Sequence, residues 1–229
     1  MSVRYALYFA PAAQHPLWSA GCGWLGRDPE SGTTFDGGPH RRDPRRYGFH
    51  ATLKPPFALR EGASRSQLLA ALSHYADERA PFAMPALAVA TLGDFVALRP
   101  VDRDITVRSH LLRALADDCV RLFDEFRRPP ASDEISRRAA AGLDEPQRAK
   151  LERWGYPHVF EQWRLHMTLT DSLPRDAEGE RLRAGLLADA RRHFDGALAE
   201  PLRCDGVALF VEDAPGADFR LLRRFDFAR

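Results

Sequence analysis

The chain has 229 residues, of which 45% are hydrophobic and 28% charged, as expected for one globular domain or two small lobes. Its 33 basic and 32 acidic side chains leave a formal net charge of +1, which argues against a general nucleic-acid coat and makes any anion site local. The three scattered cysteines form no C-x-x-C pair and no long apolar run occurs, so we expect a reduced, cytoplasmic protein without a disulfide framework, zinc knuckle or membrane segment.

Hydrophobic periodicity and turn residues predict an alternation of strands and helices. The first part of the chain contains a buried strand at 5–9, a helix from about 15 to 25, a loop at 27–46, a strand at 47–54 stopped by Pro55 and Pro56, a helix at 64–79, and strands at 82–92 and 94–100. The middle contains a long amphipathic helix at 106–127 and a charged stretch at 132–154 that ends in a helix from 144. The last part contains a strand at 163–172, a helix at 176–194, and strands at 202–212 and 219–227.

One pattern, His-x-Thr-apolar, occurs twice, as His50-Ala51-Thr52-Leu53 and as His166-Met167-Thr168-Leu169. Because side chains alternate along a strand, each motif turns its apolar residues to one face and its His and Thr to the other. If the two polar faces meet across a cleft, they bring two imidazoles and two hydroxyls together. This set of groups suits an anionic phosphate that must both give and take a proton.

The elements that follow the two motifs are also alike. Each motif strand precedes a helix and then two strands, which favours an internal duplication of a β-α-β-β unit. A pseudo-two-fold axis would then bring the two motif strands side by side. We therefore expect a single bilobal domain over 1–229, with a mostly helical, charged insertion at about 106–160.

Histidine suits this chemistry because its ordinary pKa, about 6.5, allows it to act as a base or an acid near neutral pH. A neutral imidazole can deprotonate water, and an imidazolium can protonate a leaving alkoxide, each contributing roughly 10²–10⁴-fold in rate. The hydroxyls of Thr52 and Thr168 can hold the non-bridging phosphoryl oxygens. The sequence does not say which histidine is the acid.

The paired motifs in a duplicated α/β framework resemble the 2H phosphoesterase superfamily. The wider contexts, Arg46 to Phe57, Trp154 to Pro157 and Phe160 to Leu169, are similar to a branch encoded with bacterial phosphonate-degradation genes. The resemblance implies an α+β fold of the 2H phosphoesterase/RNA-ligase-like type, with two pseudo-symmetric lobes whose antiparallel sheets face a central cleft and helices outside. It also implies hydrolysis or transesterification of cyclic phosphodiesters without metal or cofactor. The implied substrate is a ribose cyclic phosphate, such as 5-phosphoribosyl 1,2-cyclic phosphate.

Five further residues are candidates for contacts with substrate. Lys54 and Arg164 flank the motifs on the predicted polar faces, where each either contacts phosphate or is a solvated strand-end cation. Tyr47 and Tyr156 either stack on a base, bond a phosphate or belong to the core. Arg138 either reads a second phosphate from a lid or lies on a solvated face.

Three other functions remain open on the sequence alone. The same chemistry could act on RNA ends that carry a 2′,3′-cyclic phosphate, the domain could be a non-catalytic module for phosphorylated ligands, or it could be a metallohydrolase. No H-E-x-x-H, G-x-x-x-x-G-K-[ST] or G-x-G-x-x-G motif occurs, which disfavours zinc, nucleoside triphosphate and dinucleotide sites. We expect a small-molecule substrate and no membrane partner, with a monomer as a plausible state.

Overall fold

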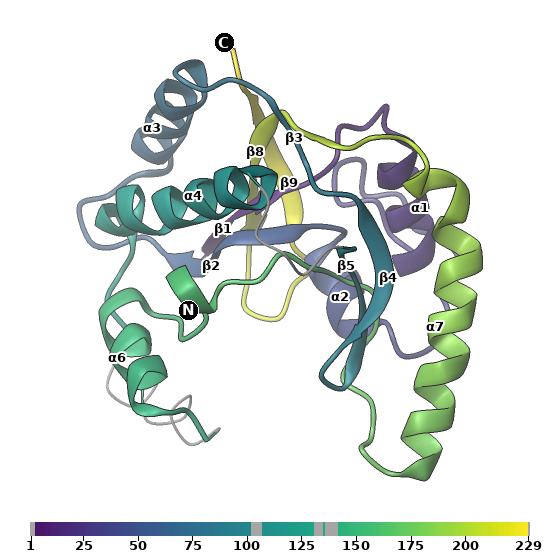
Figure 1. Ribbon diagram of the computed structural model, residues 1–229. Coiled ribbons are helices and arrows are strands. Elements are labelled where there is room, and N and C mark those ends of the chain that lie inside the picture. Colours follow the sequence, from purple (N-terminus) through teal and green to yellow (C-terminus); the bar gives the residue numbers. More distant parts are fainter. Residues whose placement is uncertain (1–2, 102–106, 131–134, 136–141, 229) are drawn as a thin grey trace.

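The computed structural model describes residues 3–101, 107–130, 135 and 142–228. Its centre is a seven-stranded antiparallel sheet with helices outside it (Figure 1). The strand order is β4 (Leu87–Leu92), β5 (Phe95–Pro100), β6 (Met167–Thr168), β2 (Ala51–Ala58), β1 (Arg4–Phe9), β8 (Gly206–Glu212) and β9 (Arg220–Asp226). A second antiparallel sheet pairs β3 (Phe82–Ala83) with β7 (Arg203–Cys204). The α+β class with antiparallel sheets is therefore confirmed, and the two lobes are the two ends of one continuous sheet.

The described helices lie on both flanks of the main sheet (Figure 1). They are α1 (Pro16–Leu25), α2 (Arg42–Tyr47), α3 (Arg65–Asp77), α4 (Val107–Leu122), α6 (Glu145–Trp154) and α7 (Ala177–Leu198), with short 3₁₀ helices η1 (Asp124–Phe126) and η2 (Phe160–Gln162). Helix α4 packs on β2 and α3 on β8 and β9, whereas α7 packs on α1, β4 and β5. In the described part of the chain, no helix is both long and apolar enough to cross a membrane.

Side-chain caps explain where two of these helices begin. Ser64 accepts a hydrogen bond from the N–H of Gln67, whose side chain in turn accepts one from the N–H of Ser64. Asp144 and Gln147 make the same reciprocal pair at the start of α6. Each capping box satisfies two backbone donors that the first helical turn leaves unpaired, and its sequence signature places the start of the helix correctly.

The order of elements along the chain agrees with the expected duplication, and the strand order in the main sheet agrees with it in part. The chain runs through β2-α3-β3-β4-β5 and later through β6-α7-β7-β8-β9. Equivalent strands lie next to each other in both sheets, since Ala51 of β2 pairs with Met167 of β6 and Phe82 of β3 pairs with Cys204 of β7. Adjacent equivalent strands are what a pseudo-two-fold axis produces. Two features break the symmetry of the main sheet: β1 lies between β2 and β8, and β5 pairs with β6 whereas its equivalent β9 is the edge strand beyond β8.

The predicted end of the first motif strand is wrong, because β2 continues through Pro55 and Pro56 to Ala58. Proline cannot donate to a ladder, but here β6 pairs only with Ala51 at the start of β2. On the other side, the register with β1 shifts between Tyr5 and Leu7, so both prolines fall in an irregular stretch that needs no donor from them.

Two other predicted boundaries also differ. The second motif strand was expected over 163–172, but β6 contains only Met167–Thr168. Beyond β6, the hydroxyl of Thr170 accepts a hydrogen bond from the N–H of Val96, in place of a backbone carbonyl of a neighbouring strand. The expected loop at 27–46 contains the start of α2, whose first N–H groups are capped by the distant carboxylate of Asp171.

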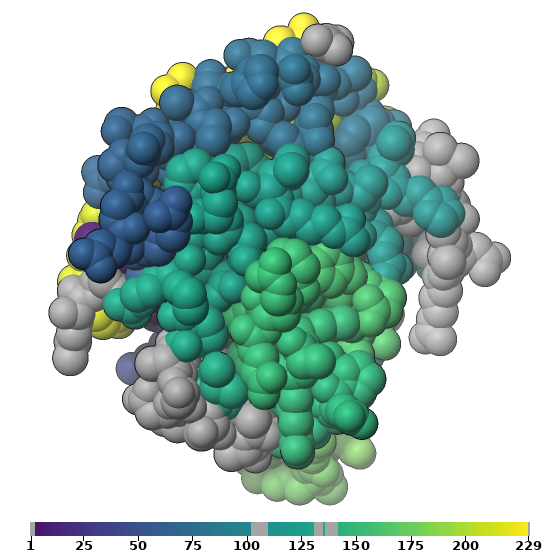
Figure 2. All heavy atoms as spheres, turned by 90° about the vertical axis from the view of Figure 1, so that its left-hand side faces the viewer, coloured from purple at the N-terminus to yellow at the C-terminus, as the bar shows by residue number. Residues whose placement is uncertain are grey.

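The described part of the charged region 107–162 forms one wall of the molecule. Figure 2 shows α4 in teal beside the green atoms of α6 and the segment that follows it. The guanidinium of Arg121 lies 4.7 Å from the centre of the Phe160 ring at this contact. From here the chain returns to the sheet and enters β6.

Candidate active site

The pairing of β2 with β6 places both motifs on one face of the sheet. Ala51 is directly opposite Met167, so the residues on either side of each project from the opposite face together. His50, Thr52, His166 and Thr168 accordingly line one cavity of about 330 Å³. The structure thus brings together all four residues that the sequence singled out for catalysis.

Both imidazoles are held by the same backbone contact. His50 Nδ1 lies 2.8 Å from the carbonyl oxygen of Gly48, and His166 Nδ1 lies 2.8 Å from that of Arg164. A carbonyl oxygen can only accept, so Nδ1 carries the hydrogen in both rings. When either ring is neutral, its Nε2 has the free lone pair. Nε2 is therefore the nitrogen that can take or give a proton in the cavity.

Local backbone geometry explains the position of the His50 ring. Gly48 ends α2 with φ +81°, a conformation that glycine adopts without strain, and a Cβ there would lie 2.9 Å from Pro29. Its carbonyl thereby reaches back to His50 Nδ1. The Tyr8 ring stacks on the imidazole with centroids 3.7 Å apart, and the Thr52 hydroxyl lies 3.2 Å from Nε2.

Burial sets the protonation states of the two rings. It lowers the pKa of His50 to about 4, against the raising effect of the Gly48 carbonyl and with a further lowering by His166. Burial also lowers the pKa of His166, against the bond to the Arg164 carbonyl and with Arg99 and His158 lowering it further. Both rings are therefore neutral at pH 7 in the free protein. An anionic ligand would favour the protonated form of a neighbouring ring.

The two candidate tyrosines also line the 330 Å³ cavity. Tyr47 stacks on Phe219 at 5.1 Å, and its hydroxyl accepts a hydrogen bond of 3.2 Å from Arg46. Tyr156 enters from the segment after α6 and makes an edge-on contact with His158. Both rings are placed to contact a ligand beside the two histidines.

Lys54 does not lie at the cleft, contrary to the expectation that it contacts phosphate. Leu7 pairs with Lys54 and Tyr8 with Thr52, so β2 has one extra residue there and its alternation of faces is reversed. The Lys54 side chain is 2% exposed and donates to the Val120 carbonyl at 3.0 Å and to Asp124 at 3.3 Å. Arg138, the remaining candidate, lies outside the described residues.

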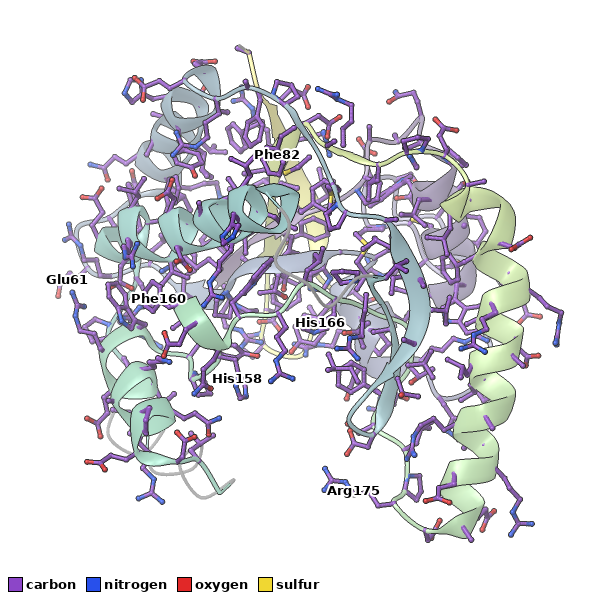
Figure 3. All side chains as sticks on the ribbon, in the orientation of Figure 1. Glu61, Phe82, His158, Phe160, His166 and Arg175 are labelled. Atoms are coloured by element: carbon purple, nitrogen blue, oxygen red, sulfur yellow. The ribbon has the colours of Figure 1, made fainter. Side chains whose placement is uncertain are left out.

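A second, larger compartment of about 840 Å³ adjoins the first and shares His166, Thr52 and Tyr156 with it. Arg164 lines this compartment. Two residues that the sequence analysis did not select lie there as well: His158 from the segment after α6 and Arg175 from the loop before α7 (Figure 3). Isolated in loops, neither carries a sequence signal of its own.

The smaller compartment contains further residues that sequence reasoning missed. Tyr8 was identified only as part of a buried strand, and Phe95 only as part of a strand after a turn. Asp43 and Asp171 complete one side. Among the residues that the structure describes, no group of three or more His, Cys, Asp or Glu side chains is arranged to hold a metal ion.

Comparison with known proteins assigns the chain to a family. A model described as "Protein of unknown function (DUF1045)" matches residues 52–220, and the chain belongs to this family. The match includes Thr52, His166 and Thr168 and begins two residues after His50.

Two curated relatives carry the name "Ribose 1,5-bisphosphate phosphokinase PhnN". The one from Janthinobacterium sp. (strain Marseille) is 38% identical over 98% of this chain, and the one from Laribacter hongkongensis (strain HLHK9) is 39% identical over 96%. Each alignment covers 51% of the relative, so the chain spans about half the length of these proteins. Among solved structures, E. coli LigT complexed with 3′-AMP matches over 100% of both chains, with a TM-score of 0.39 and 12% identity, too low a likeness to support an argument.

Proposed function

We propose that the chain is a 2H-type phosphodiesterase that opens a small cyclic phosphodiester by acid–base catalysis, without a metal ion. The observation that carries this proposal is the matched pair of imidazoles. Each ring has Nδ1 bonded to the carbonyl two residues before it, and both rings line one cavity. A module that only binds phosphate has no need for two imidazoles that can each take or give a proton at Nε2.

In the proposed reaction, one neutral imidazole takes a proton from water at Nε2 as the water oxygen attacks phosphorus. The other imidazole, protonated, gives its Nε2 proton to the ring oxygen that leaves. One P–O bond forms and one breaks, and the product is a phosphate monoester with a free hydroxyl. The hydroxyls of Thr52 and Thr168 can bond the non-bridging oxygens, where charge accumulates in the transition state.

For the substrate, we propose a cyclic phosphate of ribose. The names of the two relatives refer to a ribose carrying phosphate at C1. Opening a ribose 1,2-cyclic phosphate at the bond between phosphorus and O2 would leave a phosphate at that position. Since this chain has no G-x-x-x-x-G-K-[ST] motif and spans half of each relative, we do not extend the phosphokinase activity to it.

The test is hydrolysis followed by phosphorus NMR in the presence of EDTA. The panel contains ribose 1,2-cyclic phosphate, 2′,3′-cyclic nucleotides and a short RNA with a cyclic end. Wild type should open a small cyclic ester, and His50→Ala or His166→Ala should each reduce turnover by about 10²–10⁴-fold with an unchanged circular-dichroism spectrum.

Other outcomes would redirect the assignment. Unchanged turnover in both single variants would exclude two-histidine catalysis. Activity lost in EDTA and restored by a divalent metal would identify a metallohydrolase. Turnover of the RNA end alone would move the substrate class to RNA.

A further inference from the structure

The two compartments of the cleft differ in charge, although they share His166 and Thr52. The smaller one contains the carboxylates of Asp43 and Asp171 and, among the described residues, no Lys or Arg. The larger one contains Arg164 and Arg175 together with His158. A ligand with a phosphate at the two motif histidines and a second negative group therefore has one favourable direction, toward the larger compartment.

The carboxylates of the larger compartment already have cationic partners. Asp94 accepts from Arg175 at 3.1 Å, and Glu161 is paired with Lys150. Arg164 is exposed and has no ion-pair partner among the described residues, so its guanidinium is available to a ligand. Arginine can hold two phosphate oxygens at once through its planar fork of donors.

The side chains of Arg164, Arg175 and His158 reach this compartment from different segments, and Arg175 does so while paired with Asp94. Figure 3 shows His166 near the middle, His158 on the side of α6 and Arg175 on the side of α7. Arg164 lies two residues before His166 and lines the same compartment. A volume of about 840 Å³ is within the usual range for a small-molecule site, roughly 300–1,000 Å³, and leaves room for a group beyond the reacting one.

We propose that the larger compartment is a subsite for a second phosphate group, held by Arg164 with His158 and Arg175. The substrate is then a cyclic phosphodiester that also carries a separate phosphate ester on the same sugar. This inference rests on the proposed function, because it takes the two motif histidines as the place where the cyclic ester reacts. It adds the residues that select one cyclic ester over another.

The experiment compares two substrates that differ only in the second phosphate: 5-phosphoribosyl 1,2-cyclic phosphate and ribose 1,2-cyclic phosphate. Arg164→Ala keeps the backbone carbonyl that holds His166, so it tests the side chain alone. It should reduce kcat/KM for the 5-phosphorylated substrate by roughly tenfold to a hundredfold, the effect of one charge-assisted hydrogen bond. For the unphosphorylated substrate, kcat/KM should change by less than about threefold.

Two further variants complete the comparison. Arg175→Ala should also reduce kcat/KM for the 5-phosphorylated substrate only, but by about fivefold or less, because the Arg175 side chain is 83% exposed. Arg191→Ala removes the same charge from an exposed position of α7 outside both compartments and should affect neither substrate. An equal loss on both substrates in Arg164→Ala would place this residue at the reacting phosphate, and no loss on either would remove it from the site; both results overturn the subsite.

A binding measurement separates the subsite from the catalytic proposal. Ribose 5-phosphate is titrated calorimetrically into the His50→Ala/His166→Ala protein, with ribose as the control ligand. We expect binding of ribose 5-phosphate only, and its loss when Arg164→Ala is added. If wild type opens neither cyclic ester, the proposed function fails while this titration still decides the subsite; an absence of binding, or binding that Arg164→Ala leaves unchanged, overturns it.

Discussion

The two motif histidines share one backbone contact but differ in what surrounds the ring. His50 is stacked on Tyr8 at 3.7 Å and has the Thr52 hydroxyl at 3.2 Å from Nε2. His166 has Phe95 as a tilted neighbour at 5.9 Å and lines both compartments. The first ring is thus held on its face and at both nitrogens, whereas the second has a hydrogen-bond partner at Nδ1 alone among the described residues. Partial burial lowers the pKa of both rings, so both are mainly neutral at pH 7 when no ligand is bound.

The lowered pKa values predict an acidic optimum for kcat/KM, which reports the free enzyme. The reaction needs one neutral and one protonated imidazole, and this state is most populated between the two pKa values, one about 4 and the other below 6.5. A bound phosphate raises both pKa values because it favours imidazolium. The basic limb of kcat should therefore lie at higher pH than that of kcat/KM.

Ribose 1,2-cyclic phosphate suits this measurement, because a phosphate monoester would itself titrate near pH 6 and obscure the profile. The two profiles should be bell-shaped and displaced from each other. A kcat/KM that is constant from pH 5 to 9, or that has its basic limb above pH 7, would contradict the lowered pKa values of the two rings.

At the scale of elements, the irregular pairing of β2 with β1 separates two residues that the sequence put on one face. Regular alternation places Lys54 with His50 and Thr52, but the extra residue in β2 turns its side chain toward α4. There Lys54 and Arg127 bind Asp124 together with Arg153 of α6. This cluster links β2, the end of α4 and α6 behind the cleft, so Lys54 has a structural position.

Burial of the Lys54 ammonium makes a specific prediction for stability against pH. Burial lowers its pKa to about 8, although Asp124 raises it. Between pH 8 and about 10.5, the unfolded chain binds more protons at this residue than the folded one, so this residue's contribution to the free energy of unfolding rises with pH. Wild type should gain up to about 3 kcal/mol over Lys54→Met across that range.

Urea unfolding of both proteins at several pH values measures this difference. It should be constant between pH 6 and 7, where the lysine is protonated in both states, and should grow above pH 8. A difference that stays flat up to pH 10.5 would show that the folded protein holds Lys54 with its ordinary proton affinity.

The boundary between what could and could not be predicted from the sequence follows from these contacts. The alternation of His50 with Ala51 and of His166 with Met167 predicts the shared face, and the structure places the four motif residues together. The position of Lys54 could not be predicted, because a bulge depends on how β1 aligns with β2. Nor could the roles of Gly48 and Arg164, which act through backbone carbonyls that carry no residue-specific signal.

At the scale of the whole molecule, the two halves of the main sheet meet at the candidate active site, where strands β2 and β6 share little backbone pairing. Strands β2 and β6 share the single residue pair of Ala51 with Met167. The indole of Trp163 adds a link, since its Nε1 donates to the Thr52 carbonyl at 2.8 Å. On the other side, the indole of Trp24 donates to the Leu169 carbonyl, also at 2.8 Å. Each motif thus has a carbonyl held by a tryptophan that is more than a hundred residues away in the sequence.

Trp163→Phe should therefore impair catalysis more than folding. The phenyl ring keeps most of the packing but cannot donate, so the Thr52 carbonyl loses its partner beside the cavity. We expect the free energy of unfolding to fall by about 1 kcal/mol, the contribution of one hydrogen bond. We expect kcat to fall by roughly tenfold or more, because a small displacement of a reacting group lowers the rate steeply. Trp154→Phe is the matched control, because the Trp154 indole makes an edge-on contact with Phe160 and no hydrogen bond with another described residue. The measurement is steady-state kinetics and urea unfolding of both variants. Equal effects on kcat would show that the Trp163 hydrogen bond does not align the two motifs. A loss of kcat confined to Trp163→Phe would show that this hydrogen bond between the two halves of the sheet positions Thr52 for the reaction.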